Sequence, residues 1–443
     1  MEIVRTIAEV DVLIESTAAH DIYFEEIFLD KYKLKNGASQ LDICTAISDK
    51  KFVPLYLKWE IIDKCNFSCP FCYIAGHSSN KVVRFNDIKQ HIKDFIDQGL
   101  LYCVLTGGEV LLHPDFCDIY TFLKEHGVIV EVYTNGSLIN DEYIKLFKNL
   151  NPYKIEISIY GLGKIPFKRN TNSNYNCSTI LKNILHLKEN KINVIAKTPV
   201  NRLTSAYIDD IGGWCNRHGI VHYFSTDISN GYDAYSLESF SASNDDIIRY
   251  DLKNELAYIA KNGYPDNFIK RKKSFSCAVG SYGYHINSKF ELLPCSFFNG
   301  KINGIDISRH GVKDSLFTLK NYIEPIKNTN MLNCNGCIAY SYCKMCPAIG
   351  DIIVAIDGRF KFATNNDYCL RVIGNYSEIY SSIQSNNEQC SHCGATYTVF
   401  LPVQKGYIKS EIYYCPECGT GYSCHASSSP RISLLTKRKD RLA

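Results

Sequence analysis

Fourteen of the chain's 20 cysteines fall into three groups, and each group contains pairs that are separated by only two or three residues. Close spacing of this kind brings thiolates together and is typical of metal sites. Disulfide-stabilised scaffolds are usually small secreted domains, whereas this chain has 443 residues and its first residues offer no apolar export segment. We therefore expect a cytoplasmic protein whose cysteines bind metal.

Between about residues 54 and 228, short apolar runs alternate with segments of helical periodicity, such as Ile88, Ile92, Phe95 and Ile96. This alternation predicts an α/β fold with a parallel sheet, either doubly wound or an open barrel. In such folds the chemistry lies where the strands end. The six expected strands are Tyr56–Ile62, Leu101–Leu105, Val128–Tyr133, Ile155–Ile159, Val194–Ala196 and Val221–Phe224.

The first cysteine group follows the first expected strand directly. Cys65, Cys69 and Cys72 have the spacing C-x3-C-x2-C. Three thiolates on one loop can hold three irons of a [4Fe–4S] cube and leave the fourth iron open. A structural zinc ion prefers four protein ligands, so zinc is the weaker alternative.

This loop, with Phe71 before its last cysteine, resembles the cluster loop of the radical S-adenosylmethionine (AdoMet) enzymes. The resemblance implies a partial (β/α)6 TIM-like barrel in which Cys65, Cys69 and Cys72 hold a [4Fe–4S] cluster. It also implies that the amino and carboxylate groups of AdoMet bind the open iron. An electron from the cluster would then cleave AdoMet and give a 5′-deoxyadenosyl radical that abstracts hydrogen from a substrate.

Polar loops follow the next three strands, where the same family contacts AdoMet. Gly107-Gly108-Glu109 matches the family's GGE loop, whose glycines allow close backbone approach and whose carboxylate pairs with the AdoMet ammonium. Asn135 follows the third strand, Ser158 ends the fourth, and Tyr73 is placed against the adenine. The resemblance covers about residues 54–230, and the AdoMet contacts it implies are Tyr73, Gly107, Gly108, Glu109, Asn135 and Ser158.

The second group has seven cysteines, which suit two clusters better than one tetrahedral metal. It resembles the SPASM extension of radical AdoMet peptide-modifying enzymes, which carries two auxiliary [4Fe–4S] clusters. One of its C-x2-C pairs is a residue shorter than in that family, and Phe290 stands where the family has a glycine. Zinc alone is the alternative. The resemblance implies one cluster on Cys277, Cys295 and Cys346 and the other on Cys334, Cys337, Cys343 and Cys369.

The third group forms two C-x2-C-Gly knuckles, Cys390 with Cys393 and Cys415 with Cys418. A β-hairpin is expected over residues 396–414, between the knuckles. Two knuckles joined by a hairpin predict a zinc-ribbon-like module with structural Zn²⁺, and iron is the alternative. Because no basic patch accompanies the knuckles, protein binding fits this module better than nucleic-acid binding.

The net charge of +3 comes from the last residues, so a nucleic-acid partner is disfavoured. No run approaches the roughly 18 apolar residues of a membrane helix, and no membrane partner is expected. The expected segments are residues 1–53 of unknown role, a radical AdoMet core over 54–265, a SPASM domain over 266–379, a zinc-ribbon-like module over 380–425 and a basic tail over 426–443.

The function that follows is modification of a side chain or backbone carbon of a peptide, giving a thioether or carbon–carbon crosslink in a ribosomally made peptide. The expected partners are a peptide or protein substrate and a reductant such as flavodoxin or ferredoxin. One alternative is a sulfatase-maturing enzyme that makes formylglycine, although Gly283 stands where members of that group carry an extra cysteine. A non-catalytic iron–sulfur and zinc module is the other alternative, and the intact Gly107-Gly108-Glu109 and Asn135 argue against it.

Overall fold

The chain divides into two units in a computed structural model, and each unit is described by itself. The first unit comprises residues 1–241 and 277–324, and the second comprises residues 242–276 and 325–443. The residues that the structure describes are 53–74, 82–225, 240–243, 246, 250, 279–280, 282–300, 302–327, 352–354, 360–362, 399–401, 410–414, 421–425 and 434–436.

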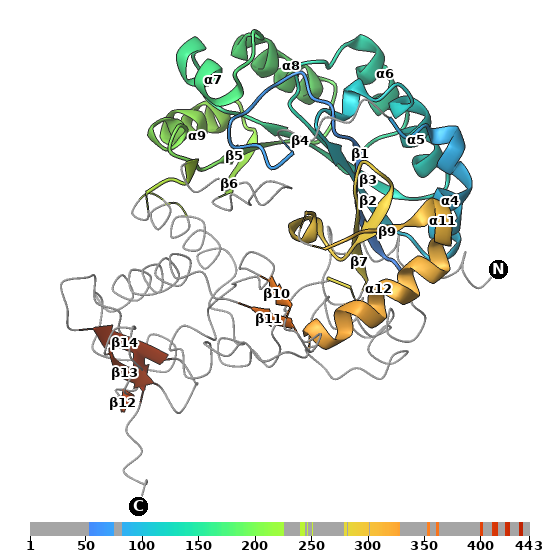
Figure 1. The fold of residues 1–443 in the computed structure, drawn as a ribbon. Helices are drawn as coiled ribbons and strands as arrows, with labels where there is room; N and C mark the ends of the chain where they lie inside the picture. Colours follow the sequence, from blue (N-terminus) through green and yellow to red (C-terminus); the bar gives the residue numbers. More distant parts are fainter. Residues whose placement is uncertain are drawn as a thin grey trace, which may run out of the picture. The chain divides into compact units, whose positions relative to one another are not determined.

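A nine-stranded sheet in the order β6-β5-β4-β3-β2-β1-β7-β8-β9 forms the centre of the first unit (Figure 1). All strands from β6 to β7 pair in parallel, and β8 and β9 add antiparallel pairs at one edge. Each of the six predicted strands overlaps an observed one, so the predicted α/β fold with a mostly parallel sheet is confirmed. The strands are β1 (Tyr56–Ile62), β2 (Tyr102–Gly107), β3 (Ile129–Thr134), β4 (Lys154–Ser158), β5 (Val194–Pro199), β6 (Val221–Ser225), β7 (Gly283–Ile286), β8 (Glu291–Leu293) and β9 (Ile305–Asp306).

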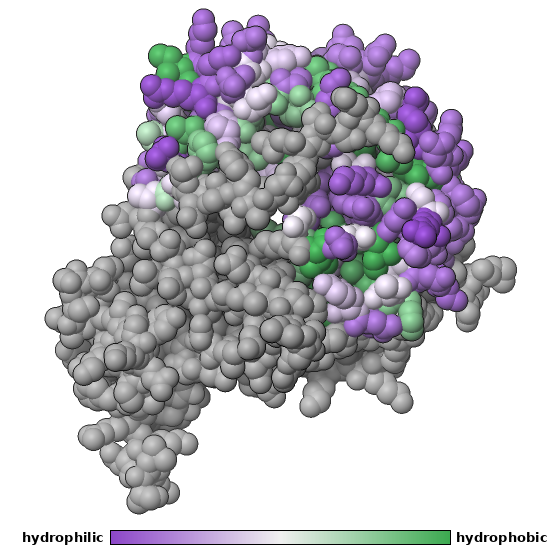
Figure 2. All heavy atoms as spheres, in the orientation of Figure 1, coloured by the Kyte–Doolittle hydropathy of each residue, from purple (hydrophilic) through white to green (hydrophobic). Residues whose placement is uncertain are grey.

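Helices cover the outer face of this sheet, and hydrophilic side chains predominate where they face solvent (Figures 1 and 2). Apolar residues at helical spacing turn inward, as Ile88, Ile92 and Phe95 do in α4. Asn140 and Asn176 cap α6 and α8 by accepting backbone N–H bonds of 3.1 Å. The helices are α4 (Phe85–Asp97), α5 (Phe116–Glu125), α6 (Asp141–Asn149), α7 (Lys164–Thr171), α8 (Cys177–Glu189), α9 (Ile208–Arg217), α11 (Ile307–His310) and α12 (Val312–Lys327), with the short 3₁₀ helices η1 (Val110–Leu112), η2 (Ser205–Tyr207) and η4 (Ser296–Phe298).

The opposite face of the parallel sheet carries charged and aromatic side chains. Lys154 Nζ lies 2.6 Å from Glu131 Oε1, and Lys197 Nζ lies 3.1 Å from Glu156 Oε1. The hydroxyl of Tyr223 also donates to Glu156. Successive residues of a strand point to opposite faces, so apolar residues alternate with these polar ones. The carboxylates are nearly buried, and each has a lysine partner that offsets the cost of removing it from water.

A tight turn joins β7 to β8 and contains an unusual backbone conformation. Phe290 has a φ of +62°, in the left-handed region that glycine adopts readily. Asn287 forms the turn, because its Oδ1 accepts from the N–H groups of Lys289 and Glu291, each at 3.0 Å. A three-residue hairpin loop that ends in a left-handed residue normally has glycine there. The glycine of the resembled family is thus replaced by Phe290 without loss of the turn.

Short strands form two small sheets in the second unit. In one, β10 (Ile352–Val354) pairs antiparallel with β11 (Phe360–Phe362). In the other, β12 (Val399–Leu401) pairs antiparallel with β13 (Ser410–Tyr414), which confirms the hairpin expected between the two knuckles.

Two further strands pair with β13 in the same sheet. They are β14 (Gly421–His425), which is antiparallel to it, and β15 (Leu434–Thr436), which is parallel. Part of the segment expected to be a solvated basic tail is therefore a strand. Across the described residues, no helix has both the length and the apolar composition needed to cross a membrane.

Candidate active site

The loop with the first three cysteines leaves the carboxyl end of β1. Its backbone is fixed by Cys72 N–H, which donates to the Cys69 carbonyl at 3.1 Å, and by Ser68 N–H, which donates to the Thr171 carbonyl at 2.9 Å. All three cysteine side chains are partly buried. Because Thr171 ends α7, the loop is attached to the helix that follows β4 as well as to β1.

Burial sets the electrostatics of these thiols. It raises the pKa of Cys65 to about 12, and the charges of Glu109 and Cys72 act in the same direction. Burial, with Cys72 and Cys65 nearby, raises the pKa of Cys69 well above its usual value. Three neighbouring thiolates therefore need a positive partner, which iron would provide.

The donor set suits a polynuclear cluster. In a cube each thiolate binds a different iron, whereas the ligands of a single ion must meet at one point. Among the described residues, no three or more His, Cys, Asp or Glu side chains are arranged to hold a single metal ion. Backbone and side-chain N–H groups face Cys65 Sγ, as they commonly face metal-bound sulfur. Cys65, Cys69 and Cys72 are thus the residues that could hold a [4Fe–4S] cluster.

The Gly107-Gly108-Glu109 loop packs directly on the backbone that leads into the cysteine loop. Gly108 N–H donates to the Ile62 carbonyl at 2.7 Å, and Glu109 N–H donates to the Lys64 carbonyl at 2.9 Å. A Cβ on Gly108 would lie 2.4 Å from the carbonyl oxygens of Asp63 and Lys64. Glycine is therefore required here for contact between two segments of the chain.

Glu109 is fully buried, and its carboxylate joins the ends of two strands. Its Oε1 accepts from Thr134 Oγ1 at 2.6 Å and from Leu111 N–H at 3.1 Å, and its Oε2 accepts from Asn135 N–H at 2.7 Å. Burial raises the pKa of Glu109, and these three donors oppose that rise. Because η1 and the end of β3 share this carboxylate, Glu109 holds both against the cysteine loop.

Asn135 extends from the end of β3 toward Cys65. Its Nδ2 lies 3.9 Å from Cys65 Sγ and donates to Asn66 Oδ1 at 2.8 Å. Asn66 Nδ2 in turn donates to Ser137 Oγ at 2.8 Å. The structure therefore brings Glu109 and Asn135, two residues named from the sequence, together beside the first cysteine.

Ser158, at the end of β4, reaches the cysteine loop through a residue that the sequence analysis did not select. It forms a hydrogen bond with Tyr160, whose side chain forms a hydrogen bond with Cys69 in turn. The ring of Tyr160 also packs 5.8 Å from that of Phe71, measured between ring centroids. Tyr160 lies two residues after the fourth strand ends, and this position was the available signal.

Tyr73 points back to the sheet. Its hydroxyl donates to Glu60 Oε1 at 3.0 Å, so this phenol is engaged by β1. Glu60 Oε1 also lies 3.5 Å from His285 Nε2 of β7, and both of these side chains are almost fully buried. Glu60 and His285 were not predicted from the sequence, although a carboxylate within the apolar run of β1 was a visible signal.

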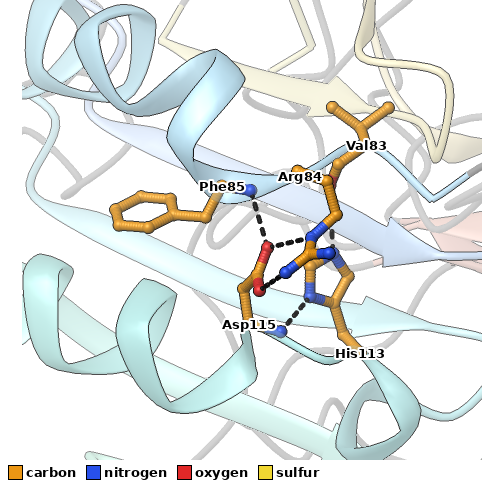
Figure 3. Close-up of polar contacts among 5 residues, drawn as sticks. All are labelled: Val83, Arg84, Phe85, His113 and Asp115. Atoms are coloured by element: carbon orange, nitrogen blue, oxygen red, sulfur yellow. Dashed lines mark hydrogen bonds and ion pairs between the residues drawn. The ribbon is translucent and has the colours of Figure 1, made fainter.

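A second polar cluster fixes the segment that enters α4 (Figure 3). Arg84 Nε donates to Asp115 Oδ2 at 2.7 Å, and Phe85 N–H donates to the same oxygen at 2.9 Å. Arg84 lowers the pKa of Asp115 to about 2. His113 Nδ1 accepts from Asp115 N–H, which places the ring proton on Nε2, where it is donated to the Val83 carbonyl. The chain just after η1 is thereby tied to the start of α4.

The other predicted metal ligands lie almost entirely outside the described residues. Cys295 is described, and it directly precedes η4, where Lys58 Nζ donates to Ser296 Oγ at 3.4 Å. The cysteines that lie outside are Cys277, Cys334, Cys337, Cys343, Cys346, Cys369, Cys390, Cys393, Cys415 and Cys418.

Comparison with known proteins agrees with this geometry. The model of the radical SAM (AdoMet) superfamily matches residues 59–203. The antilisterial bacteriocin subtilosin biosynthesis protein AlbA of Bacillus subtilis is 31% identical over 128 residues, which are 29% of this chain and 28% of AlbA. A cysteine-type anaerobic sulfatase-maturating enzyme of Clostridium novyi is 26% identical over 164 residues, 33% of this chain and 44% of that protein. The chain thus spans less than half the length of either relative.

Two solved structures share the fold. SuiB of Streptococcus suis aligns with a TM-score of 0.55 at 16% identity, covering 75% of this chain and 85% of SuiB. AdoMet-bound anSMEcpe aligns with a TM-score of 0.59 at 17% identity, covering 76% of this chain and 97% of anSMEcpe. The superfamily match begins in β1 and ends just after β5, and so it contains the cysteine loop, Glu109, Asn135 and Ser158. Residues 59–203 are therefore a radical SAM domain, and the cysteine loop at the end of β1 lies within it.

Proposed function

We propose that this chain is a radical AdoMet enzyme that modifies a peptide. The observation that carries the proposal is the loop with Cys65, Cys69 and Cys72 at the end of β1, inside a domain that matches the superfamily. When bound there, a [4Fe–4S] cluster would supply the electron that cleaves AdoMet into methionine and a 5′-deoxyadenosyl radical.

The chain's own residues would position AdoMet and exclude water. The backbone of Gly107–Glu109 and the half-buried Ser158 are the proposed AdoMet contacts, since both end strands on the side of the cysteine loop. Glu109 keeps unused lone-pair capacity on Oε2, which accepts one hydrogen bond from the protein. The hydroxyl of Tyr73 donates a hydrogen bond to Glu60, so the ring is the part of this side chain that we propose contacts the adenine.

A peptide substrate is supported by the relatives. AlbA takes part in biosynthesis of the bacteriocin subtilosin, and SuiB has been solved with its precursor peptide SuiA. We propose a thioether or a carbon–carbon crosslink in a ribosomally made peptide as the product. Formylglycine formation is the second candidate, favoured by the similarity to a sulfatase-maturating enzyme. It is disfavoured by Gly283, which lies in β7 where that group carries an extra cysteine.

The cysteines of the second and third groups complete the proposal. Two auxiliary [4Fe–4S] clusters would use the seven cysteines of the second group, and Zn²⁺ would use the two knuckles. The proposed external reductant is a flavodoxin or ferredoxin, which suits a cytoplasmic enzyme. Metal analysis of protein reconstituted without oxygen should give about 12 irons per chain for three clusters, together with one zinc.

The decisive experiment measures 5′-deoxyadenosine after anaerobic reconstitution, with dithionite and AdoMet added. Replacing Cys65, Cys69 and Cys72 together by Ala should abolish the product and leave about two thirds of the iron. The matched control is Cys117→Ala, because that thiol is exposed and lies on α5, away from the loop. A triple variant that still makes 5′-deoxyadenosine would disprove the proposal.

Mass spectrometry of a candidate peptide separates the two chemistries. A thioether removes two hydrogens and abolishes the free cysteine thiol. Formylglycine introduces an aldehyde that a hydrazide reagent captures. A short peptide encoded next to this chain is the substrate of choice, with its Cys→Ala variant as the control. Capture by the hydrazide would overturn the crosslink in favour of the second candidate.

A further inference from the structure

The side chain of Asn135 has used its entire hydrogen-bonding capacity within the protein. An asparagine amide offers two N–H donors and an oxygen with two lone pairs. Its Oδ1 accepts from Ser137 N–H at 2.9 Å and from Ser137 Oγ at 2.6 Å. Its Nδ2 faces Asn66 Oδ1 at 2.8 Å and Cys65 Sγ at 3.9 Å. This side chain therefore keeps no donor or acceptor for AdoMet.

The orientation of this amide follows from the backbone. A main-chain N–H can only donate, so the Asn135 atom that faces Ser137 N–H must be the oxygen. The nitrogen is then the atom that faces Cys65. Asn135 is also 92% buried, so water does not compete effectively for these contacts.

Cys65 Sγ receives a second N–H group from its own loop. Phe67 N–H points at the sulfur from 3.4 Å. The two donors come from different parts of the chain, because Phe67 lies on the cysteine loop and Asn135 directly follows β3. Both donors favour negative charge on the sulfur, and both lower the pKa of Cys65 against the effect of burial. Donors to the sulfur ligands of a cluster stabilise its more negative, reduced form.

We propose that Asn135 is a positioning residue of the iron–sulfur cluster: its amide N–H holds the Cys65 thiolate and raises the cluster's reduction potential. This inference rests on the proposed function, because it needs a cluster on Cys65, Cys69 and Cys72. It replaces the expectation that the Asn135 side chain contacts AdoMet. The backbone N–H of Asn135 donates to Glu109, so one residue links that carboxylate to Cys65.

Two variants and a control test this role. Asn135→Leu has similar size and no polar atoms, whereas Asn135→Asp keeps an oxygen for Ser137 and loses the donors to Asn66 and Cys65. The control Ser137→Ala removes a hydroxyl from the same cluster of contacts and leaves the N–H that faces Cys65. The uncharged Leu variant separates loss of the donor from the added charge of Asp.

The measurement is an anaerobic redox titration, without AdoMet, followed by electron paramagnetic resonance. The signal of interest is the one that disappears in the Cys65/Cys69/Cys72→Ala protein. Both Asn135 variants should move its midpoint to a more negative potential, whereas Ser137→Ala should stay near the unmodified value. Ultraviolet circular dichroism and iron content report whether each variant remains folded and loaded.

Each other outcome has a distinct meaning. An unchanged midpoint in both Asn135 variants, with weaker AdoMet binding, would overturn the inference in favour of a direct AdoMet contact. An unchanged midpoint with lower thermal stability alone would overturn it in favour of a purely structural role. If no signal depends on the three cysteines, the proposed function fails, and this inference fails with it.

Discussion

At position 290, the glycine variant should be more stable than the alanine variant, which is the reverse of the usual order. The φ of +62° at Phe290 costs a non-glycine residue about 1–2 kcal/mol, while the ring of Phe290 is buried against Trp59 and His91. Phe290→Ala would lose packing worth about 3–5 kcal/mol and keep the strained backbone. Phe290→Gly would lose the same packing and relieve the strain. After about 0.5–1 kcal/mol for the flexibility of glycine, Gly should be more stable than Ala by about 0.5–1 kcal/mol.

Urea unfolding followed by tryptophan fluorescence measures the difference in stability between Phe290→Gly and Phe290→Ala in the first unit, which contains Phe290. The chain has two tryptophans, Trp59 in β1 and Trp214 in α9, and both belong to the first unit. The fluorescence transition therefore reports the free energy of unfolding of that unit. The matched control is Leu292, which is fully buried in the adjoining β8.

At Leu292 the normal order should hold, with Leu292→Ala more stable than Leu292→Gly by about 0.5–1 kcal/mol. The difference in stability between the Ala and Gly variants should thus have opposite signs at Phe290 and Leu292. If Phe290→Gly is less stable than Phe290→Ala by the same margin as at Leu292, the left-handed conformation does not strain this residue, and the reasoning is refuted.

Three further predictions concern the candidate site and its supports. Thr134→Val should cost about 1.5–3 kcal/mol in the same urea assay, because Glu109 loses a donor to its charge, and Thr134→Ser should cost about 1 kcal/mol for one methyl group. Equal costs would contradict the role of the hydroxyl. Gly108→Ala should lower the iron content after reconstitution, whereas Gly163→Ala, with no neighbour closer than 3.7 Å to the added carbon, should not. Burial lowers the pKa of His113 in the folded protein. The contribution of His113 to stability should therefore be fully present above pH 6.5, the ordinary pKa of histidine, and should be lost as the pH falls toward the lowered pKa. His113→Gln should remove this part of the pH dependence, and an unchanged slope would exclude His113 as its source.

The sequence predicted the parallel part of the fold because its signals are local. Apolar runs separated by periodic helices gave all six strands from β1 to β6, and the cysteine spacing located the loop after β1. The pairing of β7 with β1 has no local signal, since it joins residues far apart in the chain. Glu60 and Glu131 were missed for another reason: a strand in the middle of a parallel sheet is expected to be apolar on both faces.

Side-chain direction was a further limit of the sequence. Motif matching correctly placed Asn135 and Glu109 at the carboxyl ends of the strands, but it could not predict which atoms their side chains face. That information depends on the packing of Gly108 against the cysteine loop, which is a tertiary contact. The metal-binding roles of the cysteines in the second and third groups stay predictions, because all of these cysteines except Cys295 lie outside the described residues.

The position of β1 between β2 and β7 has a consequence for biosynthesis. Tyr56 pairs with Tyr102 on one side and with Gly283 on the other. At about 5–20 residues per second, a ribosome needs roughly 10–45 s to pass from Tyr56 to Gly283. Throughout that interval β1, which leads into the loop with the three cysteines, lacks its β7 partner in the nascent chain. If iron were loaded before the chain left the ribosome, β1 would not yet be paired with β7. When synthesis ends before iron is inserted, both neighbours of β1 are in place and support the cysteine loop first.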